Sequence, residues 1–170
     1  MGAAGTSLAC GYRFGRRPAA GNPNTGEAIM KKTASAVWQG GIKDGKGSIS
    51  TESGALAQAP YGFNTRFESA PGTNPEELIG AAHAGCFSMA LSAQLGEAGL
   101  SAERIETRAS VTLEKSANGF TITAVHLDVT ARIPGADQQA FEKAANAAKA
   151  GCPVSKVLNA NITMDARLAG

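Results

Sequence analysis

Two cysteines, Cys86 and Cys152, are the residues of this chain whose type and setting could best support chemistry. Each follows a glycine in a segment with the apolar spacing of a helix. They lie too far apart in sequence for a CxxC redox turn, and the chain's 3 cysteines are too few for a disulfide framework or a closed zinc site. A thiolate that attacks a peroxide becomes a sulfenic acid, which a second thiol can convert to a disulfide. The pair is therefore a candidate for such a redox cycle.

Other roles for these cysteines stay open from the residues alone. A cysteine in an apolar helix often packs as a small hydrophobic residue, which would make the chain a non-catalytic binding protein with structural cysteines. His83, one helical turn before Cys86, could pair with the thiol as in a Cys–His hydrolase, but the sequence shows neither an orienting acid nor an oxyanion hole. A metal site of His83, Cys86 and Cys152 lacks a clear fourth ligand.

The helix that carries the first cysteine has a well-defined start. Asn74 suits the N-cap, Pro75 suits the first helical position, and Glu77 completes a capping box. We expect this helix to run to about Glu97, with Gly99 as its stop. Its first half is rich in glycine and alanine, which predicts close packing against another helix.

The second cysteine lies at the junction of two further helical segments. Apolar residues repeat with helical spacing over 138–150, Gly151 ends this pattern, and Pro153 begins a short second piece. Backbone N–H groups at a helix start favour a thiolate or an oxidised sulfur, so this junction suits a reactive Cys152.

The remaining segments alternate with the period of strands. Asp44-Gly45 and Asn118-Gly119 mark two hairpin turns. The order of strands, helix, strands, helix and strand predicts an α+β fold with antiparallel sheets. The expected strands cover 33–38, 47–51, part of an irregular aromatic stretch at 53–67, 104–115, 120–133 and 161–168.

The composition limits the class of protein. A chain of 170 residues with 43% hydrophobic and 18% charged residues is typical of one globular domain. Its net charge of +2 does not favour nucleic-acid binding. No apolar run reaches the roughly 20 residues of a membrane helix, so we expect no membrane partner. The few cysteines fit a reducing compartment, and we expect a cytoplasmic location.

Residues 1–29 differ from the rest and show no apolar periodicity. We interpret them as a leader that is disordered or artificially added, upstream of a natural start at Met30, and we set Cys10 aside with them. A secretory signal would need a continuous apolar stretch, which this segment lacks. Its arginines and its few acidic residues resemble a transit peptide only faintly. The functional domain is then expected at 31–170.

Three motifs in this domain resemble the osmotically inducible protein C (OsmC) family, in the order in which that family has them. They are Tyr-Gly-Phe-Asn-Thr-Arg-Phe at 61–67, the segment 72–91 around the first cysteine, and Lys-Ala-Gly-Cys-Pro-Val-Ser at 149–155. The resemblance covers about 31–168. Trp38-Gln-Gly and the stretch 50–54 favour the OsmC branch over the related organic hydroperoxide resistance proteins.

The resemblance implies an activity and an assembly. It implies a thiol-dependent peroxidase of oxidative and osmotic stress defence that reduces organic hydroperoxides, and hydrogen peroxide less well, through an intramolecular disulfide. No cofactor and no metal are implied, and the reductant is expected to be a dithiol such as a lipoylated protein. The implied OsmC-like fold is an intertwined homodimer with two central helices and active sites at the subunit interface.

The resemblance also implies roles for individual residues. Cys86 would be the peroxidatic thiolate and Cys152 the resolving cysteine. Arg66 would stabilise the thiolate and polarise the peroxide, and Glu77 would orient Arg66 through a salt bridge. The capping box explains Glu77 without any catalysis, and Arg66 could be an ordinary exposed residue at a strand end.

The position of Glu77 on its helix bears on the assembly. Nine residues separate Glu77 from Cys86, so at about 100° per residue the two side chains point to opposite sides of a straight helix. We therefore expect the Arg66–Glu77 pair of one subunit to serve Cys86 of the other. Apolar neighbours that could shape a pocket for an alkyl chain, or belong to the core, are Phe67, Phe87 and Met89.

Overall fold

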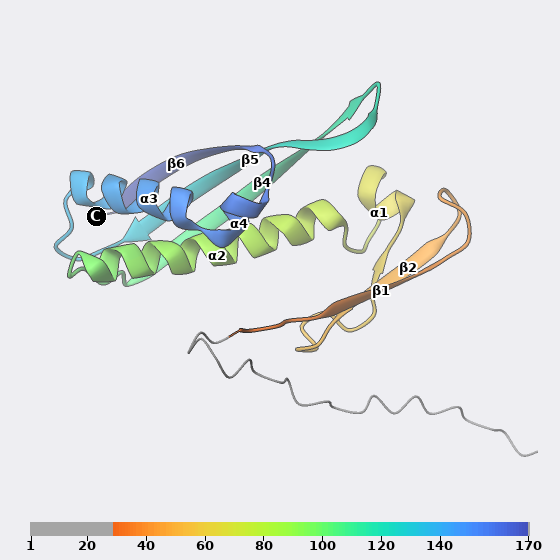
Figure 1. Ribbon diagram of the computed structural model, residues 1–170, viewed down its shortest axis with the longest axis horizontal. Helices are drawn as coiled ribbons and strands as arrows, with labels where there is room; N and C mark the ends of the chain where they lie inside the picture. The colour runs from red at the N-terminus through yellow and green to blue at the C-terminus, as the bar shows by residue number, and fades with distance from the viewer. Residues whose placement is uncertain (1–28, 170) are drawn as a thin grey trace, which may run out of the picture. The chain divides into compact units, whose positions relative to one another are not determined.

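The structure, a computed structural model, describes residues 29–169 (Figure 1). All but the last residue of the expected leader, including Cys10, lies outside this range. In the described part the chain forms two three-stranded sheets and four helices. The elements are β1 (Ala34–Gln39), β2 (Lys46–Thr51), β3 (Ala59–Tyr61), α1 (Phe63–Phe67), α2 (Pro75–Glu97), β4 (Arg104–Ser116), β5 (Gly119–Arg132), α3 (Gln138–Gly151), α4 (Pro153–Val157) and β6 (Asn161–Ala169).

The first sheet has the order β1-β2-β3, and both of its pairs are antiparallel. The predicted hairpin around Asp44-Gly45 joins β1 to β2, and Gly40 adopts a φ of 91° at the start of the turn. The irregular stretch that follows was expected to hold a strand and a loop. It holds the short strand β3 and a five-residue helix, α1, which is too short for its apolar residues to show helical periodicity.

The second sheet has the order β4-β5-β6. The hairpin predicted at Asn118-Gly119 joins β4 to β5, and Gly119 has a φ of 112°. β6 pairs in parallel with β5, so the expectation of purely antiparallel sheets is wrong at this strand. The reason is the connection: α3 and α4 lie between β5 and β6 in the chain, and a helical crossover returns the next strand in the same direction.

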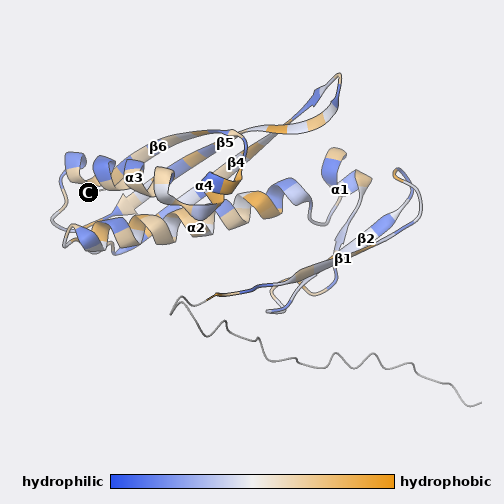
Figure 2. Ribbon diagram, in the orientation of Figure 1, coloured by the Kyte–Doolittle hydropathy of each residue, from blue (hydrophilic) through white to orange (hydrophobic). Residues whose placement is uncertain are grey.

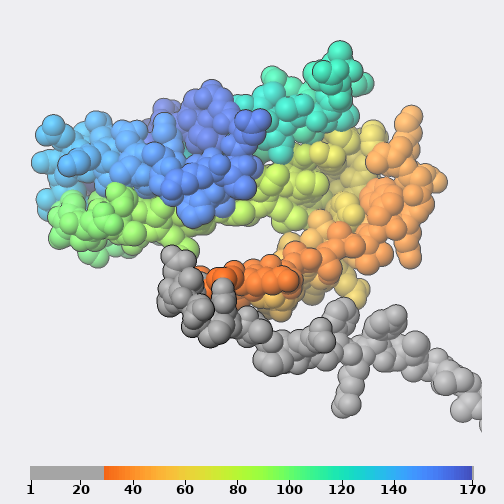
Figure 3. Space-filling model, viewed as in Figure 1, coloured from red at the N-terminus to blue at the C-terminus, as the bar shows by residue number. Residues whose placement is uncertain are grey.

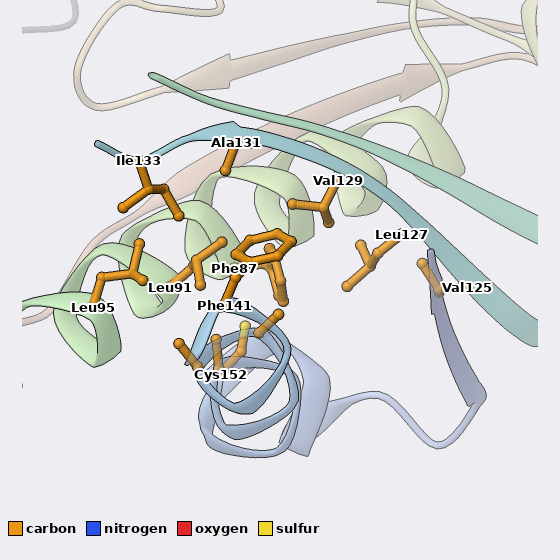
Figure 4. Packing of buried hydrophobic residues seen from close by; sticks show 13 residues of the cluster. Phe87, Leu91, Leu95, Val125, Leu127, Val129, Ala131, Ile133, Phe141 and Cys152 are labelled. Carbon is orange, nitrogen blue, oxygen red and sulfur yellow. The ribbon is translucent and has the colours of Figure 1, made fainter. Parts of the chain in front are cut away.

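The hydrophobic core lies between the second sheet and the helices packed on one of its faces (Figures 2 and 4). Alternate residues of β5 point inward, which is the period-2 pattern expected of a half-buried strand. The space-filling view shows α3 and α4 lying along α2 (Figure 3). The core residues are Phe87, Leu91, Leu95, Val125, Leu127, Val129, Ala131, Ile133, Phe141, Ala144, Ala145, Ala148 and Cys152.

Helix α2 begins at the predicted residues, with Asn74 as the N-cap and Pro75 in the first turn. The backbone N–H of Glu77 donates to the Asn74 side chain at 2.8 Å. The predicted capping box is only half formed, because the Glu77 carboxylate accepts from the Thr73 hydroxyl and not from the Asn74 backbone. Gly99, with a φ of 72°, follows the end of the helix. α2 packs against α3 and α4 as expected, but Gly80 faces β4 instead, where an added Cβ would lie 3.3 Å from the Ala109 carbonyl oxygen.

The length and mean hydropathy of α2 are also those of a membrane-spanning helix, the only such case in residues 29–169. Its abundant alanines account for much of this hydropathy. Three of its large apolar side chains, Phe87, Leu91 and Leu95, are fully buried against the chain's own core. We therefore interpret α2 as a core helix.

The close approach at Gly80 gives a first prediction. Replacing Gly80 by Val should lower the free energy of unfolding by about 1–3 kcal/mol, because the branched side chain would overpack the contact with β4. Gly96→Ala is the matched control in the same helix, since nothing lies within 4 Å of its added Cβ. Alanine there should leave stability unchanged or raise it by up to about 1 kcal/mol. Urea denaturation of both variants measures the difference, and equal effects would contradict the packing role of Gly80.

Candidate active site

The structure brings the two predicted cysteines together. Their sulfur atoms lie 2.9 Å apart and share a hydrogen bond, and both thiols are free. Cys86 comes from the middle of α2, and Cys152 is the residue between α3 and α4. Cys152 is fully buried, whereas Cys86 is half-buried. A small oxidant from solvent therefore reaches Cys86 first.

The two thiols differ in acidity. Burial raises the pKa of Cys86, and its hydrogen bond with Cys152 raises it further, although a hydrogen bond from the Val154 backbone acts in the opposite sense. Burial also opposes ionisation of Cys152. Hydrogen bonds from Cys86 and from the backbone and side chain of Ser155 outweigh this effect, so the pKa of Cys152 is lowered. Within one chain, the pKa of Cys152 is thus lowered and that of Cys86 is raised, in the absence of the arginine that was expected beside Cys86.

Arg66 forms its salt bridge with Glu76. The prediction that Glu77 would be its partner is therefore wrong by one residue. The guanidinium is bidentate: Nε donates to one carboxylate oxygen of Glu76 at 3.0 Å, and a terminal nitrogen donates to the other at 2.5 Å. The side chains of Arg66 and Glu76 are 32% and 13% exposed. Two parallel hydrogen bonds of this kind fix the orientation of the guanidinium and the position of its positive charge.

The place of Glu77 in the first turn of α2 explains the difference. Successive helical residues are rotated by about 100°, so Glu76 and Glu77 cannot both face Arg66. The carboxylate of Glu77 instead accepts a hydrogen bond from the Thr73 hydroxyl at 3.4 Å, and its backbone N–H caps the helix on Asn74. Glu77 therefore serves the helix start.

The hydroxyl of Thr65 positions Arg66. It accepts a hydrogen bond from the Gly62 backbone N–H at 2.9 Å, which closes the first turn of α1. The same hydroxyl lies 2.8 Å from the Thr73 carbonyl oxygen, just before α2. These contacts join α1 to the start of α2, so that Arg66 lies opposite Glu76.

Arg66 is not brought to the thiols of its own chain. Glu76, which holds the guanidinium, and Cys86 are ten residues apart on α2, a rise of about 15 Å. Because the salt bridge involves Glu76, the positions of Glu77 and Cys86 around the helix do not bear on where Arg66 lies. An arginine side chain held at Glu76 cannot span the rise of about 15 Å to Cys86 of the same chain.

An apolar pocket of about 310 Å³ adjoins Arg66. Phe67 contributes to its wall, whereas Phe87 belongs to the core and Met89 is 77% exposed. One of the three apolar neighbours named from the sequence thus lines the pocket. The lining residues are Trp38, Ile42, Tyr61, Gly62, Phe63, Arg66, Phe67 and Pro75.

Comparison with known proteins places these features in a family. Residues 67–167 match the family described as OsmC-like protein. The chain is 58% identical over 139 residues to Peroxiredoxin OsmC of Escherichia coli (strain K12), an alignment that covers 82% of this chain and 97% of that protein. The chain belongs to the OsmC family.

Two more distant comparisons agree with this assignment. The Organic hydroperoxide resistance protein OhrB of Bacillus subtilis (strain 168) is 31% identical over 137 residues, which cover 80% of this chain and 96% of that protein. The crystal structure of an organic hydroperoxide resistance protein OsmC from Legionella pneumophila has the same fold. It superimposes with a TM-score of 0.63 at 24% identity, over 85% of this chain and all of that one.

Two polar residues near the site of this OsmC-family chain were missed by sequence reasoning. Glu76 was overlooked because its neighbour is also a glutamate and fits the capping pattern. The hydroxyl oxygen of Ser155 lies 2.8 Å from the Nε2 atom of His83, and Ser155 also helps to lower the pKa of Cys152. Its place in the short helix that begins directly after Cys152 was the available signal.

One cluster of side chains in the described part of the chain has the residue types of a metal site. In residues 29–169, the side chains of His126, Asp128 and Asp165 offer ligand atoms within 4.8 Å of one another. They lie on the solvent side of the second sheet, and the His126 ring already pairs with both carboxylates and with the Thr163 hydroxyl. We treat this group as polar contacts on the surface of the sheet and assign no metal to it.

The short distance between the sulfurs predicts a specific disulfide. One equivalent of oxidant should join Cys86 to Cys152, because a disulfide of about 2.05 Å needs the sulfurs to move by less than 1 Å. Peptide mapping of the oxidised protein by mass spectrometry checks the connection. The disulfide should form equally well in Cys10→Ser and be absent in Cys86→Ser; a main product that links Cys10 to either cysteine would contradict the prediction.

Proposed function

We propose that this OsmC-family chain is a thiol-dependent peroxidase that reduces organic hydroperoxides. The observation that carries the proposal is the pair of free thiols 2.9 Å apart, one half-buried and one fully buried. An accessible thiol beside a protected one suits a cycle of oxidation and disulfide closure. The names of the relatives, a peroxiredoxin and an organic hydroperoxide resistance protein, support the same activity.

The reaction begins at the accessible sulfur. The Cys86 thiolate attacks the outer oxygen of the hydroperoxide, the O–O bond breaks, and the alkoxide takes up a proton and leaves as the alcohol. Cys86 is then a sulfenic acid. The sulfur of Cys152 attacks it, an S–S bond replaces the S–O bond, and water is released. A dithiol reduces the disulfide and restores both thiols.

A second copy of the chain supplies the cation that Cys86 needs. Arg66, anchored on Glu76, lies too far along α2 to serve its own Cys86. The face of α2 opposite the core is exposed and rich in glycine and alanine. On this face Gly85 is open to solvent, and the Met89 side chain is 77% exposed. Two such helices can pack closely in a homodimer and bring the Arg66 of one subunit to the Cys86 of the other. The guanidinium then lowers the pKa of Cys86 and stabilises the negative charge that develops on the peroxide.

The pocket beside Arg66 favours organic substrates. Its wall is aromatic and aliphatic apart from the guanidinium, so an alkyl or aryl group can be buried while the peroxide group lies at Arg66. Hydrogen peroxide has no apolar group to bury there and should react less efficiently. The free thiols suit a reducing compartment, and we place the enzyme in the cytoplasm, in defence against oxidative and osmotic stress, with a dithiol or lipoylated protein as reductant.

Consumption of cumene hydroperoxide in the presence of dithiothreitol tests the proposed function. Cys86→Ser should lower the rate by more than about a thousandfold, because it removes the nucleophile. Cys152→Ser should accumulate a sulfenic acid on Cys86 that dimedone traps. Cys10→Ser is the matched control and should keep the activity of the unaltered protein. Undiminished turnover by Cys86→Ser would overturn the proposal and favour structural cysteines.

The adjacent glutamates provide a second test. Glu76→Gln should slow the oxidation of Cys86 by about 10- to 100-fold, because the charged fork that orients Arg66 is lost. Glu77→Gln is the matched control and should stay within about twofold, since its backbone N–H still caps α2. Stopped-flow measurement of Cys86 oxidation gives both rates. A larger effect at Glu77 than at Glu76 would return the orienting role to Glu77.

A further inference from the structure

A row of three phenylalanine rings joins the helix that carries Arg66 to the tip of the second sheet. The rings of Phe63 and Phe67, both on α1, have centroids 4.8 Å apart. The ring of Phe120, at the β4–β5 hairpin, lies 5.0 Å from that of Phe67. Both distances are typical of favourable aromatic pairs. The row is therefore a direct contact between the second sheet and α1.

A β-bulge interrupts β5 close to the tip of its hairpin with β4. The pairing of the two strands is regular up to Thr112, which lies opposite Ala124. The next residue, Leu113, lies opposite Ile122, so Thr123 has no opposite residue. An extra residue of this kind reverses the face to which the side chains beyond it point.

The bulge determines which face of the sheet Phe120 occupies. His126 lies on the solvent side, and strict alternation over an even number of positions would place Phe120 there as well. Because of the bulge, Phe120 instead lies opposite Lys115, and opposite residues share a face. Lys115 follows Val111, which packs against the core, by two alternations of β4. Phe120 is therefore on the face that carries the helices, where it meets α1.

The Phe67 ring contacts the guanidinium of Arg66. The Cζ atom of Arg66 lies 5.2 Å from the centroid of this ring, within the range of a cation–π interaction. The ring thus adds a second restraint to the hydrogen bonds with Glu76. α1 has five residues, none of them buried, and so short a helix has little stability of its own. The place of the Phe67 ring, and with it that of Arg66, depends on the side chains packed beside it.

We propose that Phe120 is a positioning residue for Arg66, on which it acts through the ring of Phe67. The inference rests on the proposed peroxidase function and adds one residue to its first step. In that step Arg66 stabilises the Cys86 thiolate and the charge that develops on the peroxide, so a displaced guanidinium slows the attack. Disulfide closure does not use Arg66. Removing the Phe120 ring should therefore slow the oxidation of Cys86 and leave closure unchanged.

Stopped-flow measurement of Cys86 oxidation in the full-length protein tests the inference. Phe120→Ala should slow the oxidation by about fivefold at pH 7, because one aromatic pair is lost. The loss should be equal with cumene hydroperoxide and with hydrogen peroxide, since Arg66 acts on the peroxide group that both share. The pH at which the rate is half-maximal should rise, because a displaced guanidinium lowers the pKa of Cys86 less. Phe120→Tyr, which keeps the ring, should recover most of the rate.

The two peroxides and a matched variant separate positioning from other roles. Phe120 is 51% exposed and lies outside the core, so Phe120→Ala should fold. Thr121→Ala is the matched control, since Thr121 is exposed and adjacent in the strand but points to the other face. It should keep the rate with both peroxides. A loss confined to cumene hydroperoxide would overturn the inference, because Phe120 would then only shape the apolar pocket. An unchanged rate in Phe120→Ala, or an equal loss in Thr121→Ala, would also overturn it.

A readout that does not depend on peroxidase activity completes the test. The Nε–H of Arg66, which donates to Glu76 at 3.0 Å, should give its own signal in a proton–nitrogen correlation spectrum, identified by its loss in Arg66→Lys. Phe120→Ala should move this signal toward the position of freely exposed arginines, and Thr121→Ala should not. An unmoved signal in Phe120→Ala would overturn the inference whatever the protein does with peroxides. If the unaltered protein leaves cumene hydroperoxide intact while the signal moves, the proposed function fails and the positioning of Arg66 by Phe120 stands.

Discussion

The packing of α4 against α2 is the contact on which the site depends. It places the sulfurs of Cys86 and Cys152 at 2.9 Å, although 66 residues separate them in the chain. The crossover from β5 to the parallel strand β6 makes this contact possible, because it returns α3 and α4 over the same face of the sheet as α2. The buried apolar residues of α3 then hold α3 against the core, so that Cys152, at the end of α3, is itself part of the core.

The second part of the site, around Arg66, is built by separate means. Short-range hydrogen bonds of Thr65 and a forked ion pair with Glu76 hold the guanidinium, with no contribution from the main core. One chain therefore contains both the Cys86–Cys152 thiol pair and the Arg66–Glu76 ion pair, at different places along α2. Their separation is a geometric reason for the homodimer that we propose, in addition to the small exposed face of the helix.

The sequence predicted the elements well and the pairings less well. The Asn74 cap and the two hairpin turns were found because local residue types determine them. The direction of β6 was missed because strand alternation carries no information about which way a strand runs. The choice between Glu76 and Glu77 depends on how α1 meets α2, a tertiary contact that neither residue signals. The partner of His83 was missed for the same reason, since Ser155 lies 72 residues away.

The short distance between the two sulfurs before any oxidation bears on how the enzyme resists inactivation at high peroxide concentration. A sulfenic acid left exposed can react with a second peroxide and become a sulfinic acid, which is essentially irreversible. Here the capturing thiol already stands in contact, so closure needs no unfolding of a helix or rearrangement of a loop. In the cycle that we propose, overoxidation competes with closure between two sulfurs that lie 2.9 Å apart before the reaction begins. The fold thus favours an enzyme that tolerates excess substrate.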